Sequence, residues 1–444
     1  MSLVPVRGVH LDLKGLPPTP QRLLQLLNLF AAARFNCVLV EWEDAFPWDC
    51  DPRFRSDAAY TVDDVDAFHR RARELDLRVI PLVQSLGHME MPLRISDYAP
   101  LREVPDRCDG INPLAPGARE LVGRMIDDVL ARSGPITHLH VGGDEAFTFA
   151  HHPDTRAYVA QHGAAGLYLH HIRPVMESLN ARGIRPIVWH DMMCDWDERS
   201  LAEVARLADV MVWKYQDGPD DAMLERFARA GVAVWGASAY KGADSRGDAE
   251  LPDVPRRIAN ARAWHAVAAR RQLRGLIATG WSRYQAARVQ CEPIDGALDS
   301  LVRTASVFHA GDDIGEVAAA RFLASIGEIQ FPACRSALSR LTVARRSAWE
   351  YVRLFREQCS LERRDPRRQG SGVLHELRRL AHEHLTATRS AAADVRAALA
   401  AGLPPSAMES FLAERVTPLM EQVQNLDAPI VAAGHDWPVG PAAP

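Results

Sequence analysis

The segment Ile136-Thr-His-Leu-His-Val-Gly-Gly-Asp-Glu145 begins with the alternation that is typical of a β-strand. Apolar and small residues alternate with His138 and His140, so both imidazoles are expected on one face of the strand. Gly142 and Gly143 follow where the strand ends. Because these residues have no side chains, the backbone is free to bend there, or a ligand can come close to it.

Two adjacent carboxylates, Asp144 and Glu145, complete the segment. Neighbouring carboxylates repel each other, so one of the pair is expected to keep its proton to higher pH than usual. Such a pair suits general acid catalysis beside a fixed negative charge. Acidic residues are mostly solvent-exposed, however, so the pair alone does not establish a site, and the rest of the chain has to corroborate it.

On both sides of this segment, short apolar stretches with strand character recur. Most are followed by a stretch in which apolar residues have the spacing of a helix. The eight expected strands are Val9–Leu13, Cys37–Glu41, Arg78–Val83, Ile136–Val141, Arg185–His190, Asp209–Trp213, Val232–Gly236 and Leu276–Trp281. Eightfold alternation of strand and helix predicts an α/β fold, a (β/α)8 TIM barrel. A doubly wound sheet is the alternative, but no glycine-rich phosphate loop follows the first strand to support it.

Barrel enzymes carry their chemistry at the C-terminal ends of the strands. The expected strand ends here carry polar groups such as Lys14, Glu43 and His88. Tryptophans lie at or near five of them, at Trp42, Trp189, Trp213, Trp235 and Trp281. Aromatic faces stack on the apolar C–H faces of sugar rings, and the indole N–H is a donor. The pattern therefore favours a sugar-binding site over simple core packing.

The motif His140-Val-Gly-Gly-Asp-Glu145 resembles the signature of glycoside hydrolase family 20, the β-N-acetylhexosaminidases. The segments His10–Gly15, Glu41–Trp48, Pro81–His88 and Gly280–Tyr284 are similar to the hexosaminidase D branch of that family. The resemblance covers roughly residues 7–310. It implies an exo-acting, retaining hydrolase without a cofactor, which removes terminal β-linked GalNAc or GlcNAc from a small glycoside or glycan.

The resemblance also implies the chemistry, in which the 2-acetamido oxygen of the substrate attacks C1 and forms an oxazolinium ion. Glu145 would be the acid and base, and Asp144 would hold the acetamido N–H and stabilise the developing positive charge. The expected substrate-binding residues are Lys14, Glu43, His88, His140, Trp189, Trp213, Trp281, Arg283 and Tyr284. The tyrosine that orients the acetamido oxygen is left open between Tyr215, Tyr240 and Tyr284.

The chain departs from the wider family at the hydroxyl end of the sugar. Lys14 stands near the place of an arginine, and Arg283 stands where a glutamate is common. A cation and a carboxylate thus exchange places, and Glu43, Asp44 or Glu292 could supply the carboxylate. We expect tolerance of both sugars with a modest GalNAc preference, as for hexosaminidase D-like enzymes.

Two rival interpretations remain. A metal-dependent barrel hydrolase would use residues at or near strand ends, namely His138, His140, Asp144, His190 and Asp191. A barrel that binds sugar without cleaving it is the second, and the intact acid pair argues against it. No metal ligand set is therefore assigned.

The predicted domains are a catalytic barrel at 1–310 and a C-terminal α-helical region at 311–444 with a disordered tail. The helical region is expected to pack on the barrel or on a second subunit, as in a homodimer. A net charge of -5 gives no reason to expect nucleic acid. No apolar run approaches the ~20 residues of a membrane span. Seven scattered cysteines and no evident leader favour free thiols and a cytoplasmic location.

Overall fold

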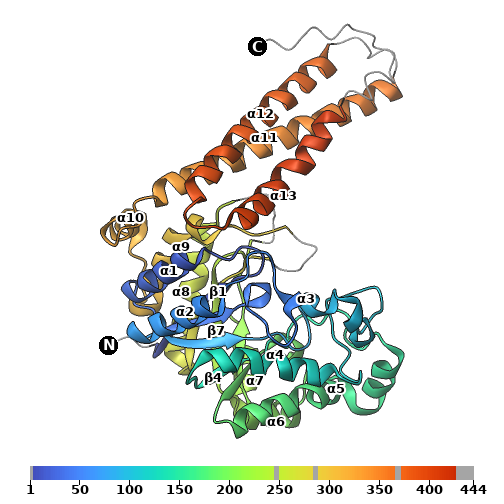
Figure 1. Ribbon diagram of the computed structural model, residues 1–444, viewed down its shortest axis with the longest axis vertical. Coiled ribbons are helices and arrows are strands. Elements are labelled where there is room, and N and C mark those ends of the chain that lie inside the picture. The colour runs from blue at the N-terminus through green and yellow to red at the C-terminus, as the bar shows by residue number, and fades with distance from the viewer. Residues whose placement is uncertain (1–3, 245–249, 284–288, 366–371, 427–444) are drawn as a thin grey trace.

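The computed structural model describes residues 4–244, 250–283, 289–365 and 372–426 (Figure 1). In this part of the chain, eight parallel strands close into a barrel in sequence order. They are β1 (Val6–Asp12), β2 (Cys37–Glu41), β3 (Arg78–Leu82), β4 (His138–His140), β5 (Arg185–Trp189), β6 (Asp209–Trp213), β7 (Val234–Lys241) and β8 (Gly275–Gly280). The predicted (β/α)8 TIM barrel is therefore confirmed.

Helices cover the outside of the barrel and then continue beyond it. They are α1 (Pro20–Ala32), α2 (Val62–Glu74), α3 (Glu90–Leu93), α4 (Ala118–Ser133), α5 (Pro153–Ala181), α6 (Glu198–Leu207), α7 (Asp221–Arg229), α8 (Val254–Arg271), α9 (Leu298–Ala310), α10 (Gly315–Ser325), α11 (Phe331–Arg364), α12 (Val373–Leu399) and α13 (Pro405–Gln424). Local sequence sets several of their starts. At α2, for example, Thr61 and Asp64 form a reciprocal capping box.

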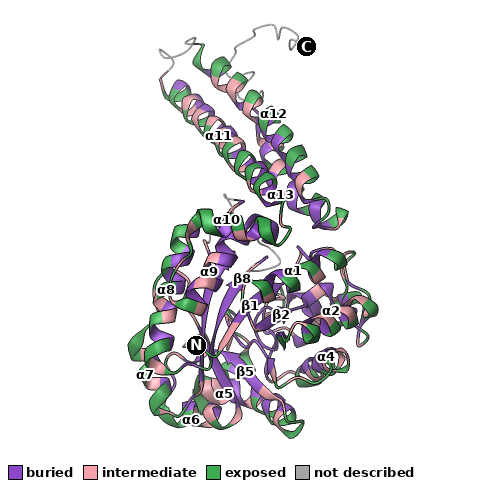
Figure 2. Cartoon of the chain, turned by 90° about the vertical axis from the view of Figure 1, so that its left-hand side faces the viewer, coloured by how far each residue is buried: buried purple, intermediate pink, exposed green. Residues whose placement is uncertain are grey.

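The core has two layers. Inside the barrel, an apolar cluster includes Ile187, Trp189, Met211 and Trp235, and a larger cluster fills the space between the strands and the helices. Figure 2 shows this as buried strands surrounded by helices with exposed outer faces. The inner layer is what supports any site at the C-terminal ends of the strands.

The seventh strand differs from its prediction. β7 begins at Val234 and runs to Lys241, so Trp235 lies near its start. There the Trp235 indole donates to Asp209 Oδ2 over 3.0 Å, at the N-terminal end of the barrel. The small residues that follow, Ala237 to Ala239, remain paired with β8 and extend the strand. The prediction of Trp235 at a C-terminal strand end is therefore wrong.

Helices α11, α12 and α13, here called the arm (residues 331–426), project from one side of the barrel (Figure 1). They contain two apolar clusters of their own, and Leu16 of the barrel packs into the nearer one. The predicted C-terminal helical region is thus present, with its base against the barrel. The tail that was predicted to be disordered falls in 427–444, outside the described residues.

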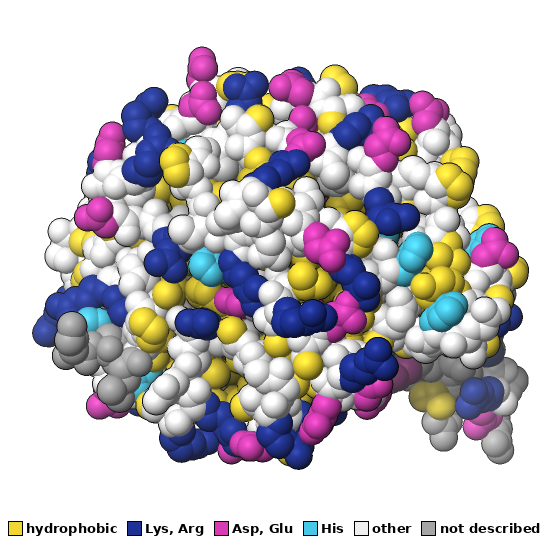
Figure 3. All heavy atoms as spheres, turned by 90° about the horizontal axis from the view of Figure 1, so that it is seen from below, with side chains coloured by type: hydrophobic (Ala, Val, Ile, Leu, Met, Phe, Trp, Pro, Cys, Tyr) yellow, Lys and Arg dark blue, Asp and Glu magenta, His cyan; other side chains and the backbone are white. Residues whose placement is uncertain are grey.

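The surface is mixed in character. On the face in Figure 3, acidic and basic side chains are interspersed, with hydrophobic side chains between them. Among the described helices, none combines the length and apolar character that crossing a membrane would need. All seven cysteines lie in the described residues and are free thiols, as expected from the sequence.

Candidate active site

The two acids of the motif lie directly beyond β4, and His88 from the β3 loop lies between them. His88 Nε2 is 3.5 Å from Asp144 Oδ2 and 3.2 Å from Glu145 Oε2. Burial alone would lower the pKa of His88, but the two carboxylates outweigh it and hold the pKa well above its usual value. The imidazole is therefore protonated at neutral pH. Its charge reduces the repulsion between the adjacent acids.

The two acids differ in exposure. The Asp144 side chain is 7% exposed, whereas that of Glu145 is 36% exposed. Asp144 Oδ1 is buried and has no hydrogen-bond partner among the described residues. A buried acceptor without a partner is costly, and a ligand N–H would relieve that cost. The pair thus combines an accessible acid with a buried acceptor that is available to a ligand.

Glycine makes this approach of the β3 and β4 loops possible. A Cβ atom at Gly87 would lie 2.1 Å from the backbone oxygen of Asp144. At Gly142, which has a φ of +62°, it would lie 2.0 Å from Gln84 Oε1. A side chain at Gly87 would meet backbone and push the loops apart, whereas one at Gly142 would displace the Gln84 side chain and strain the backbone at its positive φ. The glycines therefore serve to bring His88 against the acid pair.

A third carboxylate, Asp191 after β5, binds the backbone of the acid pair. Its Oδ2 accepts the backbone N–H of Glu145 over 2.8 Å, and its Oδ1 accepts the Trp213 indole N–H over 3.2 Å. Burial and the nearby charge of Asp144 raise the pKa of Asp191 to about 7. The sequence placed Asp191 only in the rival metal set. Like the other candidate residues, Asp191 is a polar residue just beyond a predicted strand. That pattern does not reveal its contact with Glu145.

Aromatic rings stand next to these acids. Trp213 and Tyr215 stack with centroids 5.3 Å apart, and Tyr215 lies 6.4 Å from Trp281. Trp281 in turn lies 6.1 Å from Trp189, which is fully buried in the barrel interior. Among the three candidate tyrosines, Tyr215 is the one in this group. Tyr240 packs in the layer between strands and helices, and Tyr284 lies outside the described residues.

The other two predicted strand-end tryptophans do not join this group. Trp235 lies at the opposite end of the barrel, as described above. Trp42 packs against Phe46 and Phe68 in the outer layer. Its predicted place at a strand end is right, but it lies on the same side of the strand as Val38 and Val40, which face the helices. Three of the five tryptophans, Trp189, Trp213 and Trp281, therefore form the aromatic wall.

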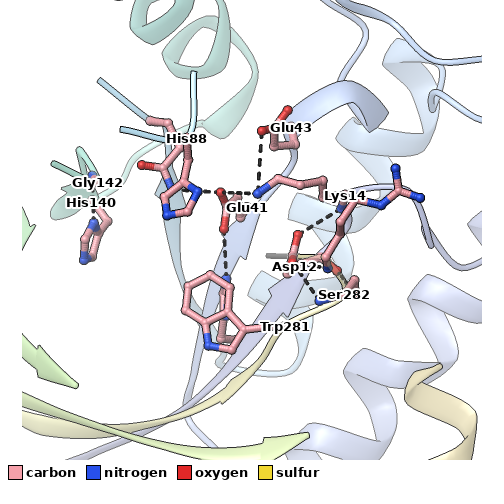
Figure 4. A network of polar contacts seen from close by, with 12 residues as sticks. Asp12, Lys14, Glu41, Glu43, His88, His140, Gly142, Trp281 and Ser282 are labelled. Carbon is pink, nitrogen blue, oxygen red and sulfur yellow. Dashed lines mark hydrogen bonds and ion pairs between the residues drawn. The ribbon is translucent and has the colours of Figure 1, made fainter. Parts of the chain in front are cut away.

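A polar cluster occupies the ends of β1 and β2 (Figure 4). Lys14 Nζ lies 3.6 Å from Glu41 Oε1 and 3.7 Å from Glu43 Oε1. Asp12 Oδ1 accepts the Lys14 backbone N–H over 2.9 Å. A narrow pocket is lined in part by Glu41, Glu43 and His88, so the cluster adjoins the acid pair. Lys14 and Glu43, which the sequence predicted as sugar-binding residues, are thus brought together in one compact group.

The charges in this cluster are unequal. Burial would raise the pKa of Glu41, but Lys14 and His10 hold it well below its usual range. Burial would lower the pKa of Lys14, and the carboxylates, Glu41 above all, raise it well above its usual value. For Glu43, burial prevails and raises the pKa to about 8. At neutral pH the cluster therefore contains an ionised Glu41, a charged Lys14 and a largely protonated Glu43.

Arg283 forms an ion pair with a residue that the sequence analysis did not suggest. Its Nη2 atom lies 2.5 Å from Glu414 Oε1, on α13 of the arm. Glu292, which the sequence offered as a partner, instead accepts the backbone N–H of Gly242 over 3.1 Å. Local sequence patterns contain no signal for the contact between Arg283 and Glu414, because 131 residues separate them.

The histidines of the rival metal site are not brought together. His138 lies at the N-terminal end of the barrel, 3.9 Å from Asp209, and His140 Nδ1 accepts the backbone N–H of Gly142. Burial lowers the pKa of His140 to about 3, so it is neutral. Among the described residues, His88, Asp144 and Glu145 do offer ligand atoms within 4.8 Å of one another. Two of these three residues are the acid pair itself, and the third is the histidine that lies between them.

Comparison with known proteins agrees with this geometry. Residues 5–268 match the family described as "Glycosyl hydrolase family 20, catalytic domain". That match covers more than half of the chain.

The chain belongs to glycosyl hydrolase family 20.

Within family 20, the chain is 35% identical to hexosaminidase D of Homo sapiens over 311 residues, which are 67% of this chain and 64% of the human protein. It is 33% identical to hexosaminidase D of Bos taurus over 322 residues, 69% of this chain and 93% of the bovine protein. The resemblance to the hexosaminidase D branch is thereby confirmed. The matched region spans 64% of the human relative's length, which is less than two thirds.

A family-20 structure, the chitobiase of Flavobacterium johnsoniae, superposes with a TM-score of 0.56 at 14% identity. It covers 96% of this chain and 73% of that chain. At this identity the likeness supports the fold alone. The family match ends at residue 268, so β8, α9 and the arm lie beyond it.

Proposed function

We propose that this family-20 chain is an exo-acting, retaining β-N-acetylhexosaminidase that removes terminal β-linked GalNAc or GlcNAc. The observation that carries the proposal is the acid pair. Asp144 and Glu145 lie side by side beyond β4, one buried and one partly exposed, with a protonated His88 within 3.5 Å of both. This arrangement supplies an accessible proton donor beside a fixed negative charge.

The two acids take different roles in substrate-assisted catalysis. Glu145, which is the more exposed, protonates the leaving oxygen while the substrate's acetamido oxygen forms a bond to C1. Asp144 accepts the acetamido N–H at its unpartnered Oδ1 and stabilises the oxazolinium charge. Glu145, now ionised, takes a proton from water, and that water opens the oxazolinium at C1. The configuration is retained because C1 is attacked twice.

The aromatic wall accommodates the sugar and its acetyl group. Trp213 and Trp281 are partly exposed and offer ring faces that suit the apolar faces of a pyranose, and the fully buried Trp189 supports Trp281 from the barrel interior. Tyr215 stacks on Trp213 and is our candidate for orienting the acetamido oxygen. His140 contributes indirectly, by fixing the turn at Gly142 that precedes the acids.

Lys14 and Glu43 are our candidates for the sugar hydroxyls. Both are buried, and their head groups lie 3.7 Å apart. Glu43 lines a small cavity that His88 also lines. A largely protonated Glu43 can donate as well as accept a hydrogen bond, so it can pair with a 4-hydroxyl in either orientation. We therefore propose that both sugars are accepted. The modest GalNAc preference that we also propose rests on the similarity to hexosaminidase D.

The test uses aryl β-glycosides of GlcNAc and GalNAc, together with a thiazoline mimic of the oxazolinium. We expect turnover of both substrates and strong inhibition by the thiazoline. Asp144→Asn should lower kcat by about 10²-fold or more while the melting temperature changes little. Failure of the thiazoline to inhibit the wild type at millimolar concentration would refute substrate assistance. A homodimer formed through the arm and a cytoplasmic location stay predictions, the first of which size-exclusion chromatography with light scattering would check.

A further inference from the structure

The arm reaches the rim of the barrel through two adjacent residues of α13, Glu414 and Arg415. One oxygen of Glu414 binds the guanidinium of Arg283, and the other accepts the backbone N–H of Gln290 over 2.7 Å. Arg415 Nη2 donates to the backbone oxygen of the same Gln290 over 2.8 Å. Both peptide groups of Gln290, together with Arg283, are therefore held by a single turn of the arm.

The contact extends from Gln290 to the first strand. The Gln290 side chain donates to the backbone oxygen of Gly15 over 2.6 Å. Gly15 has a φ of +71°, and a Cβ there would lie 3.1 Å from the Gln290 amide nitrogen. Gly15 directly follows Lys14, the cation of the polar cluster. The arm thus supports the segments that follow β1 and β8 together.

A buried charge group anchors the same helix near the end of β7. Glu250, whose side chain is 0% exposed, lies 3.1 Å from Arg415 and 2.9 Å from Arg345 of α11. All three residues are buried. A buried charge is strongly destabilising when its partner is removed, so these groups fix the position of α13 relative to the barrel. The docking of α13 is therefore specific rather than a loose apolar contact.

Trp281 of the aromatic wall lies two residues before Arg283, which is held in this way. The Trp281 carbonyl accepts from Lys241 Nζ over 2.6 Å, and the backbone N–H of Ser282 donates to Asp12 over 2.7 Å. The next side chain, Arg283, is the one bound by Glu414. The Trp281 ring lies edge-on to His10 at 4.8 Å, so a shift of its backbone would displace it directly.

We propose that the arm is a working part of the sugar site and that Glu414 is a positioning residue. Through Arg283 and Gln290 it fixes the end of β8, and with it the ring of Trp281. This inference rests on the proposed function, because it gives Trp281 the role of a sugar platform. It extends the site beyond residue 268, where the family match ends.

The test compares Glu414→Gln with Glu409→Gln, a matched control on the same helix. Glu409 also accepts two hydrogen bonds from an arginine, Arg396 of α12, but it is exposed and pairs within the arm. Both variants keep the shape of the side chain and remove its charge. For Glu414→Gln we expect KM for both aryl glycosides to rise about 10- to 100-fold, with a much smaller change in kcat. Glu409→Gln should match the wild type.

Hydrogen exchange on the intact protein gives a second measurement that does not depend on turnover. Amides of Ser282, Arg283 and Gln290 should exchange faster in Glu414→Gln, while those of α11 and α12 stay protected. Unchanged exchange at these amides would overturn the inference, as would equal KM values in the two variants. General loss of protection throughout the arm would also overturn it, because Glu414 would then act on arm stability. If the wild type does not hydrolyse the glycosides but Glu414→Gln shows the expected faster exchange, the proposed function alone is refuted.

A double-variant cycle assigns the effect to the contact itself. Because Arg283 and Glu414 act as one unit in this view, Arg283→Gln with Glu414→Gln should raise KM no further than Glu414→Gln alone. Effects that multiply in the double variant would overturn the inference.

Discussion

The replacement Asp191→Asn tests the support behind the acid pair most directly. The carboxylate accepts two hydrogens, from the Glu145 backbone N–H and from the Trp213 indole. Asparagine has nearly the same shape but only one acceptor oxygen, so its NH2 group has to face one of the two donors. A hydrogen bond to a charged group is worth about 1.5–3 kcal/mol. We therefore expect kcat/KM to fall about 10- to 150-fold.

The size of this loss should depend on pH. Burial and Asp144 raise the pKa of Asp191 to about 7. Below that pH the wild-type side chain is protonated, and its hydroxyl also offers a donor where an acceptor is needed. Above it, the ionised carboxylate accepts both hydrogens. The ratio of wild-type to variant kcat/KM should therefore be small near pH 5.5 and reach its full value by about pH 8.

Asp209→Asn provides the control for this experiment. Asp209 is buried, and it also accepts from an indole, that of Trp235, and from Arg185 Nε over 2.9 Å. It lies at the N-terminal end of the barrel, so its replacement should lower the melting temperature and leave kcat/KM unchanged. The steady-state assay with an aryl N-acetylhexosaminide, run across pH with both variants, decides the matter. A ratio independent of pH, or an equal loss in Asp209→Asn, would refute the role given to Asp191.

Three further predictions concern the same site. Glu145→Gln should lose about 10²–10⁴-fold in kcat on poor leaving groups and much less on activated aryl glycosides; equal losses on both would indicate a structural role. Burial raises the pKa of Glu43 to about 8 in the folded protein, whereas a glutamate in the unfolded chain has a pKa of about 4.3. Between about pH 4.5 and 8, the folded protein therefore keeps a proton on Glu43 that the unfolded chain has released. The free energy of unfolding should therefore fall as pH rises from 4.5 to 8, by up to about 3–5 kcal/mol from this group, and urea denaturation of Glu43→Gln should show a flatter pH dependence; parallel curves would contradict it. Chelators should leave activity unchanged because no proposed step needs a Lewis acid, whereas loss that zinc restores would favour an ion held by His88, Asp144 and Glu145.

Strand–helix periodicity was enough to predict the barrel, because it depends on local patterns of burial. It did not fix where a strand lies along the barrel axis. Trp235 shows this, since β7 begins only one residue before it and continues well beyond it. Likewise Trp42 occupies a strand end, but it continues the alternation that places Val38 and Val40 in the outer layer, so its ring faces the helices. Because β2 is buried on both faces, its sequence does not show which set of alternate residues faces the barrel axis.

The acid pair and its aromatic neighbours could be predicted because the motif is contiguous and strand ends converge in a barrel. The contacts that complete the site could not. His88 reaches Asp144 across two loops whose close approach depends on Gly87. Arg283 meets Glu414 only through the packing of the arm, and local sequence contains no signal for a partner 131 residues away.

Closure of the barrel also bears on how the chain reaches its active form. β1 pairs with β8, from Val6 opposite Gly275 to Val9 opposite Ala278. During synthesis, one edge of the first strand therefore stays unpaired until almost two thirds of the chain has emerged. Such long-range pairing is slow, and an unpaired strand edge is prone to aggregation. Glu414 and Arg415 follow later still, near the end of the described chain. A nascent chain in which the acid pair has just been synthesised thus still lacks both the last strand and the turn of α13 that binds Gln290.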